Sequence, residues 1–225
     1  MFDAHRHLSG EKEPYDALYC TSYQGEWAGV TNLPHPAIGA IGALADKTLP
    51  PIAMMARHLE IHPHLQVGEV GLDKRFEDLE GQQSFLLATL DLAFSMQRSV
   101  TVHVVRSDAL FLSCLNKTGK RIPPILWHGF TGSVETAKIA AGKGCIISLG
   151  PRIEHTRLAK RLGELSSLSF AIETDYENAM RERPYIQAIE EQYELIGRLM
   201  QMDRETLIRN NRAKRAILTN NAPSR

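Results

Sequence analysis

Short stretches of β-forming residues alternate along this chain with longer amphipathic stretches, and this alternation limits the possible folds more than any other feature. A strand, a helical crossover and a second strand of the same sheet form a right-handed unit with parallel strands. The chain is therefore expected to be an α/β protein with a parallel sheet. Eight strands are predicted, near Phe2–His5, Leu18–Thr21, Ala37–Ile41, Gln66–Val70, Val100–Val104, Pro124–Trp127, Gly144–Ser148 and Leu168–Ile172.

Between and after these strands the apolar residues recur with helical spacing. Ser133 and Asp203 are expected to cap two of the helices, and Pro184 suits a first turn. The predicted helices are Pro50–Ile61, Leu79–Gln97, Ser107–Lys117, Ser133–Ala141, His155–Leu165, Pro184–Met202 and Arg204–Leu218.

Eight such units in 225 residues predict a compact (β/α)₈ TIM barrel near the lower size limit of that fold. The first units are shortened, because residues 6–17 are too few for a helical crossover and Gln24–Val30 offers at most one or two helical turns. An open doubly wound sheet is the alternative architecture. Since no repeat or linker divides the chain, residues 1–225 are expected to form a single domain.

The composition is that of an ordinary globular protein, with 43% hydrophobic residues, a formal net charge of zero and a pI near 7.1. This balance argues against a polybasic nucleic-acid-binding module. No signal peptide and no apolar run long enough to cross a membrane is recognisable, and three scattered cysteines indicate buried, reduced thiols. We therefore expect a cytoplasmic protein with no membrane association and no obligate protein partner.

Polar, ionisable residues follow one predicted strand after another at the same end. The first strand carries the alternating pattern of "DAHRH", in which Asp3, His5 and His7 are expected to share one face. The carboxyl ends of the strands of a parallel barrel meet at one mouth. The other members of this set are Glu69 in "VGEVGLD", His103 in "TVHVVRSDA", His128 in "ILWHGFTG" and Asp175 in "AIETDYEN".

Four imidazoles and two carboxylates at one barrel mouth require a cation, and this donor set suits one or two divalent metal ions. Each residue alone has an ordinary structural explanation, as a hydrogen-bonded core histidine, a helix cap or an ion pair. Their convergence favours the metal site. Gly68, Gly71 and Gly129 adjoin the proposed ligands and allow close approach of the backbone.

The motifs "DAHRH", "GEVGLD", "HVVRSDA", "HGFTG" and "ETD", in this order and spacing, resemble the TatD family of metal-dependent deoxyribonucleases in the amidohydrolase superfamily. The segment "RETLIRNNRAKRAIL" is similar to the closing helix of that family. The resemblance covers the chain from Asp3 to about Leu218. It implies a TIM barrel that binds two divalent ions (Mg, Mn or Zn) and hydrolyses phosphodiester bonds, typically trimming DNA from the 3′ end.

The resemblance also implies a role for each matching residue. His5 and His7 correspond to ligands of one ion, His103 and His128 to ligands of the second, and Glu69 to the carboxylate that bridges them. Asp175 corresponds to the aspartate of the last strand, which binds metal and handles the proton of the attacking water. Two bridged ions would lower the pKa of a shared water, and the resulting hydroxide would attack phosphorus.

Other charged residues near these motifs are candidates for supporting roles. Arg106, Lys74 and Arg152 are candidate contacts to substrate phosphates, with solvated surface charges as the alternative. Asp73 and Glu173 are expected to lie beside ligating histidines.

The chain departs from the family pattern in three places. Arg106 lies three residues after His103, where the family has His-Ser-Arg. Tyr176–Glu177–Asn178 replaces a Pro-Tyr pair, and the third strand lacks a following His-Pro. These changes affect the rim of the substrate site and leave the proposed ligands in place.

Three alternative functions remain open at this point. The same ligands can hydrolyse a small amide, lactone or phosphoester, which the neutral pI favours because extended contact with DNA usually needs several basic residues. A metal-binding protein without catalysis would be favoured by a missing ligand, and none is missing. A non-catalytic nucleic-acid-binding module would need an aromatic and basic surface motif, which the sequence lacks. The remaining histidines are expected in loops or on the surface, with "HPH" at residues 62–64 as a helix stop: His35, His58, His62, His64 and His155.

Overall fold

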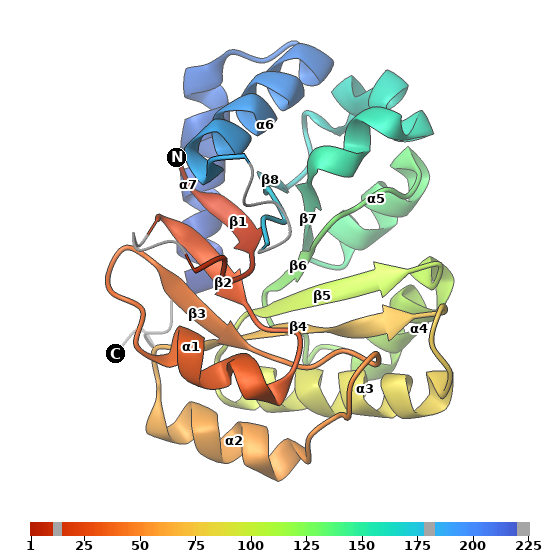
Figure 1. Ribbon diagram of the computed structural model, residues 1–225. Coiled ribbons are helices and arrows are strands. Elements are labelled where there is room, and N and C mark those ends of the chain that lie inside the picture. Colours follow the sequence, from red (N-terminus) through yellow and green to blue (C-terminus); the bar gives the residue numbers. More distant parts are fainter. Residues whose placement is uncertain (11–14, 178–182, 220–225) are drawn as a thin grey trace.

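Eight parallel strands follow one another around a nearly closed barrel in their order along the chain (Figure 1). The computed structural model describes residues 1–10, 15–177 and 183–219. All eight predicted strands are present, and the barrel rather than the open sheet is confirmed. Their bounds are β1 Asp3–Arg6, β2 Ala17–Cys20, β3 Ile38–Ile41, β4 Gln66–Asp73, β5 Val100–Val105, β6 Ile125–Trp127, β7 Cys145–Leu149 and β8 Phe170–Ile172.

Parallel pairing links each strand to the next, and it is longest between β4 and β5, where the register shifts once between Val67 and Val70. That ladder runs from Val67 opposite Val100 to Asp73 opposite Val105. Because all the strands are parallel, their carboxyl ends open at one mouth, toward which the arrowheads of β4 and β5 point in Figure 1. The pairing therefore brings residues that are far apart in sequence to one end of the barrel.

The register of β1 shifts between Asp3 and Arg6, which breaks the simple alternation expected for "DAHRH". The Asp3 carboxylate turns to the loop after β8, where it accepts hydrogen bonds from the Thr174 N–H at 3.0 Å and the Thr174 hydroxyl at 2.6 Å. Asp3 therefore does not share the face of His5 and His7, and that prediction is wrong. A local irregularity of this kind has no signal in the residue pattern.

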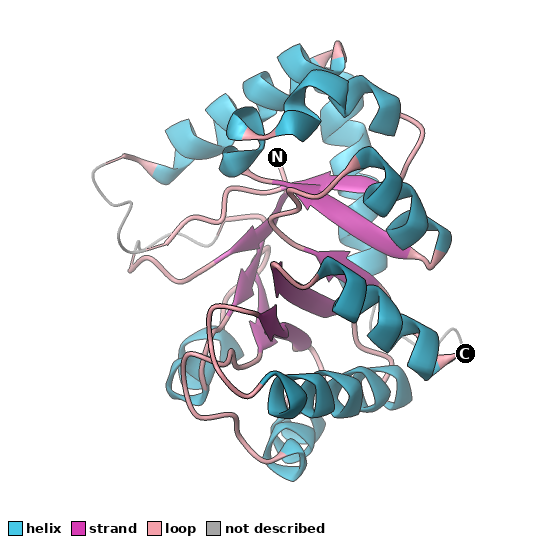
Figure 2. Cartoon of the chain, turned by 90° about the vertical axis from the view of Figure 1, so that its right-hand side faces the viewer, coloured by secondary structure: helices cyan, strands magenta, loops and turns pink. Residues whose placement is uncertain are grey.

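Helices cover the outside of the strands (Figure 2), and the shortened first units are confirmed. The predicted helix at His155–Leu165 is instead a pair of 3₁₀ helices, η2 Pro151–His155 and η3 Arg157–Leu165. Between β2 and β3 lie only η1 Gln24–Glu26 and α1 Trp27–Thr31. The other helices are α2 Ile52–Ile61, α3 Leu79–Ser95, α4 Asp108–Thr118, α5 Val134–Gly142, α6 Tyr185–Met200 and α7 Arg204–Thr219.

The expected caps are present where the sequence placed them. The Ser133 hydroxyl accepts from the Thr136 N–H at 3.0 Å, and the Asp203 carboxylate accepts from the Thr206 N–H at 2.8 Å. Such caps satisfy backbone donors that have no partner inside the helix. They help to define where α5 and α7 begin.

Two hydrophobic clusters fill the fold. Alternate residues of β2 belong to different clusters, as expected for a strand that is buried on both faces. Ala17 and Tyr19 pack in the larger cluster with the surrounding helices, and Leu18 and Cys20 pack in a smaller one made mostly of strand residues. All three cysteines are buried and free. No helix in the described part of the chain is both long and apolar enough to span a bilayer.

Candidate metal centre

Six of the side chains predicted from the strand ends meet at the mouth of the barrel. Glu69, in β4, lies at the middle of the group and is almost completely buried. The others reach it from β1, β5, β6 and β8 or the residues that directly follow them, so five separate parts of the chain contribute. The group consists of His5, His7, Glu69, His103, His128 and Asp175.

The two carboxylate oxygens of Glu69 face different sets of imidazoles. Oε1 lies 2.7 Å from His103 Nδ1 and 2.6 Å from His128 Nε2. Oε2 lies 3.5 Å from His7 Nε2 and 4.0 Å from His5 Nε2. The centre is thus divided into two halves that share a single carboxylate.

Asp175 completes the half that contains the histidines of β1. Its Oδ1 lies 3.3 Å from His5 Nε2 and 3.7 Å from His7 Nε2. The backbone of Asp175 has a φ of 52°, a left-handed conformation that few non-glycine residues adopt. Such strained conformations concentrate at functional sites because surrounding contacts must hold them.

Hydrogen-bonding groups behind the histidines fix how the rings are turned. His7 Nδ1–H donates to the carbonyl of Cys20 at 3.1 Å, which directs Nε2 into the centre. Asp73 Oδ2 lies 3.4 Å from His103 Nε2, and Glu173 Oε1 lies 3.7 Å from His128 Nδ1. Asp73 and Glu173 therefore lie beside histidines, as the sequence predicted.

Two glycines allow the backbone to approach closely around the centre. A Cβ on Gly71 would lie 1.8 Å from the carbonyl oxygen of His103, so only glycine fits at this point of the ladder. Gly129, directly after His128, has a φ of 58°, and its N–H donates to Glu173 at 2.6 Å. The expected close approach is confirmed at both positions.

The electrostatics of the centre favour ionised carboxylates. Burial alone would raise the pKa of Glu69, but the charge of His128 and the hydrogen bond from His103 hold this pKa well below the usual range. The pKa of Asp175 is also well below its usual value, because the close imidazoles of His5 and His7 outweigh burial. Burial alone would lower the pKa of His7, but the close carboxylate of Asp175 and the charge of Glu69 raise it to about 9. The site thus attracts positive charge.

His5 is the residue that best tests whether a metal fits. It is completely buried, and neither of its ring nitrogens has a hydrogen-bond partner among the described residues. Burial and the nearby His128 lower the pKa of His5, which leaves its imidazole neutral and able to act as a ligand. An unpaired buried nitrogen is costly unless a cation binds it. Donor atoms close enough to hold an ion occur in two sets, His5–Glu69–His128 and His5–His7–Asp175.

The three predicted phosphate contacts have different positions. Arg152 reaches the centre, with a guanidinium nitrogen 3.4 Å from Asp175 Oδ2. Lys74 and Arg106 are exposed, and no side-chain contact is seen for either within the described residues. It is Arg75, next to Lys74, that pairs with Asp73, its Nε 2.9 Å from Oδ1.

Sequence reasoning missed two groups that support the centre. The Ser22 hydroxyl, two residues beyond the end of β2, donates to Glu69 Oε2 at 3.4 Å, and its position after a strand end was the available signal. The second group is Arg6, which lies between His5 and His7 in the sequence and whose side chain is buried. Its guanidinium carbon lies 3.7–5.4 Å from the centroids of four tyrosine rings: Tyr15, Tyr19, Tyr176 and Tyr185. No local pattern predicts this tyrosine cage.

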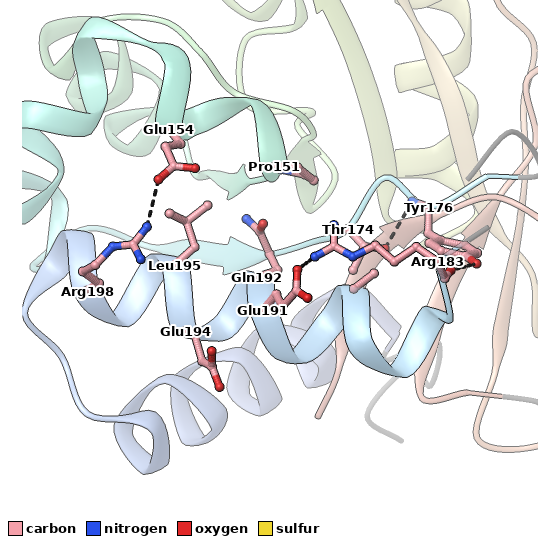
Figure 3. Close-up of a pocket in the computed structure, with 11 residues that line it drawn as sticks. Pro151, Glu154, Thr174, Tyr176, Arg183, Glu191, Gln192, Glu194, Leu195 and Arg198 are labelled. Atoms are coloured by element: carbon pink, nitrogen blue, oxygen red, sulfur yellow. Dashed lines mark hydrogen bonds and ion pairs between the residues drawn. The ribbon is translucent and has the colours of Figure 1, made fainter. Parts of the chain in front are cut away.

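A cavity of about 700 Å³ adjoins the mouth between the 3₁₀ segment and α6 (Figure 3). Thr174 and Tyr176, on either side of Asp175, form one end of it. Glu154 pairs with Arg198 across the other end at 2.8 Å. The cavity therefore offers a mixed polar surface next to the candidate centre. Of the family departures noted at residues 176–178, Tyr176 is buried, whereas Asn178 lies outside the described residues.

The structure is an eight-stranded α/β barrel with a candidate metal-binding donor set at its mouth, and comparison with known proteins gives the family. The family model described as TatD related DNase matches residues 35–215, which is more than half of the chain. The chain therefore belongs to the TatD-related DNase family. A search of curated proteins gives no match.

Solved structures with the same fold cover nearly the whole chain. A TatD homologue of Escherichia coli, YJJV, superposes with a TM-score of 0.82 at 21% identity, over 99% of this chain and 98% of the other. A TatD family hydrolase of Entamoeba histolytica gives 0.78 at 12% identity, over 98% of both chains. An uncharacterised amidohydrolase of Saccharomyces cerevisiae gives 0.65 at 12% identity, over 96% and 99%. These likenesses establish the fold.

Proposed function

We propose that the chain, as one domain over residues 1–225, is a metal-dependent hydrolase that cleaves phosphodiester bonds of DNA, in the manner of a 3′–5′ exonuclease. The observation that carries the proposal is the division of the Glu69 carboxylate, with one oxygen facing His103 and His128 and the other facing His5 and His7. A carboxylate in this arrangement suits the bridge between two divalent ions. Membership of a DNase family supports DNA as the substrate.

Each half of the centre has the donors that one ion needs. His5, His7 and Asp175 would hold the first ion, His103 and His128 the second, and Glu69 both. Imidazole and carboxylate donors suit Zn²⁺ and Mn²⁺, and Mg²⁺ fits the carboxylates. Two bound ions would supply a water of lowered pKa and would offset negative charge on the phosphate.

The residues around the ions have separate tasks in this proposal. The Asp175 carboxylate accepts the proton of the attacking water and returns it to the leaving oxygen. Arg152, which already contacts Asp175 Oδ2, donates to a phosphate oxygen at the rim. Asp73 and Glu173 keep His103 and His128 turned toward the centre.

The cavity beside Asp175 favours a second candidate, hydrolysis of a small amide, lactone or phosphoester. Its volume of about 700 Å³ is typical of sites for small molecules. The two candidates share the metal centre and differ in substrate. Comparing single-stranded DNA with a generic phosphodiester, an amide and a lactone under Mn²⁺ decides between them, because the proposal expects DNA to give the highest kcat/KM.

The role of Asp175 is tested by its conservative variant. Asp175→Asn keeps the size and one oxygen but removes the base, so kcat should fall by about 10²-fold or more. KM should change less, because phosphate contacts remain. Normal turnover in a variant that retains its metal would contradict the proposed role. Metal analysis of the same sample separates a lost base from a lost ion.

A further inference from the structure

Three histidines that the barrel centre does not use gather on the outer surface, at the end of α2. His58 lies in the last turn of the helix, His62 directly follows it, and His64 comes two residues later. All three touch one another or a common neighbour, Thr31, at the end of α1. The prediction of "HPH" as a helix stop is confirmed, but His58 is half-buried within the helix rather than in a loop.

His58 and His62 are one helical turn apart and face each other. The His62 N–H donates to the His58 carbonyl at 3.0 Å, which holds both residues in the same turn. Their ring centroids are 4.7 Å apart with the planes inclined by 46°. Residues four apart lie on one face of a helix, so two imidazoles at this spacing can bind a single ion.

Hydrogen bonds behind His58 leave a nitrogen ready for a ligand. The Thr31 hydroxyl donates its hydrogen to the Trp27 carbonyl at 2.7 Å, so it accepts from His58 Nε2–H at 3.1 Å. The lone pair of the His58 ring is then on Nδ1. Histidines that bind metals usually donate their other ring N–H to a protein oxygen in this way.

The protonation state also suits a metal ligand. Burial and the neighbouring His62 lower the pKa of His58, so its ring is neutral at neutral pH. Neutral imidazole is the form that binds metal.

We propose that His58 and His62 form a second metal site, a two-imidazole chelate for a first-row divalent transition ion such as Cu²⁺, Ni²⁺ or Zn²⁺. Water and other nearby donors fill the remaining positions. Mg²⁺ prefers oxygen ligands and should not bind this pair. A bound ion would lie close to Trp27, whose ring centroid is 5.4 Å from that of His58.

The test is the number of Ni²⁺ ions bound by tag-free protein in equilibrium dialysis. His62→Gln should bind one ion per chain fewer than His155→Gln, a matched variant of an exposed histidine outside the cluster. His58→Gln should lose the same ion, and the double variant should lose no more than either single variant. Because the barrel centre is intact in all of them, its Ni²⁺ cancels in the comparison.

A second readout uses the nearby indole. Paramagnetic Cu²⁺ at the chelate should quench the fluorescence of Trp27 in the wild-type protein and in His155→Gln, and this component should disappear in His62→Gln. Circular dichroism verifies that the surface variants are folded. Equal Ni²⁺ stoichiometry and equal quenching in His62→Gln and His155→Gln would overturn the proposal.

Discussion

Strands β4 and β5 are joined by a long main-chain ladder with one register shift, between Val67 and Val70, whereas β8 and β1 are joined mainly by side chains. At this seam the Asn211 side chain from α7 donates to the carbonyls of Phe2 and Ile172 and accepts from the Ile172 N–H at 2.9 Å. Just beyond the carboxyl end of β8, the Asp3 carboxylate accepts hydrogen bonds from the N–H and the hydroxyl of Thr174. Two further backbone bonds lie beyond the strands, from Asp175 to His5 and from His7 to Tyr176.

The difference matters because each side supplies part of the candidate centre. The ladder side provides Glu69 and His103, which main-chain contacts hold in place: the Glu69 N–H donates to the Thr21 carbonyl at 2.8 Å, and His103 pairs with Gly71 in the ladder. The seam side provides His5, His7 and Asp175, whose spacing depends on a few buried polar side chains. The seam is therefore expected to be the more sensitive side to substitution.

The largest effect should come from Glu69, where the two sides meet. Glu69→Gln removes the charge shared by both sets of histidines, so both proposed ions should bind more weakly and the hydrolytic rate should fall by about 10²-fold or more. His128→Gln is the comparison, and it should chiefly empty one site. Metal titration measures both, and two full sites in Glu69→Gln would rule out the shared role.

The next largest effect should come from the seam residue Asn211. Asn211→Leu keeps the side-chain size but removes the side-chain partners of the buried Ile172 N–H and carbonyl and leaves the Phe2 carbonyl with only the Tyr193 hydroxyl, which should lower the free energy of unfolding by about 3–5 kcal/mol. Thr89 in α3, packed near β4, is the matched control because its buried hydroxyl has no partner in the described structure. Thr89→Val should change stability by less than about 1 kcal/mol in urea unfolding. Equal losses would contradict the proposed difference between the two sides.

A smaller effect is expected for two arginines near the centre, whose substitution should lower metal affinity to different extents. Arg6→Met removes a buried cation from among tyrosines that belong to both β1–β2 and the segment after β8, so His5, His7 and Asp175 should lose alignment. We expect metal affinity and kcat to fall by about tenfold, roughly 1.4 kcal/mol.

Arg75→Met on the ladder side is the control for Arg6→Met. The Arg75 guanidinium is 53% exposed, whereas the Asp73 carboxylate that it pairs with is only 5% exposed. Because water can replace the exposed guanidinium, its loss should cost about 1 kcal/mol and leave metal affinity within about threefold. If Arg75→Met weakened metal binding as much as Arg6→Met, the β8–β1 side would not be more sensitive to substitution than the β4–β5 side, and the proposed difference would be wrong.

Much of the centre could be predicted because its residues follow apolar strands directly. An apolar run that ends in His103 or His128 indicates both the strand and the position of the ligand at its end. The (β/α)₈ architecture follows from the same alternation. The helix at residues 155–165 was wrong in type, because apolar spacing does not distinguish a 3₁₀ helix from an α-helix over so few turns.

The seam could not be predicted, because its contacts join residues at opposite ends of the chain. Asn211 lies in the segment that resembles the closing helix of the family, but nothing in that segment indicates its contact with Phe2, which depends on the closed barrel. Arg6 reads as an exposed charge between two histidines, yet it is buried among tyrosines. Asp3 was misplaced because the register shift of β1 follows from its partners, not from its own residues.

The most direct test of the central claim is an anomalous difference map from a crystal of the protein loaded with Mn²⁺. The account predicts two peaks at the barrel mouth, one beside Glu69 Oε1 with His103 and His128, and one beside Glu69 Oε2 with His5, His7 and Asp175. The two peaks should be about 3.5–4 Å apart, the spacing of ions that share a carboxylate. A map with no peak at Glu69, or with a single peak that contacts only one of its oxygens, would contradict the account.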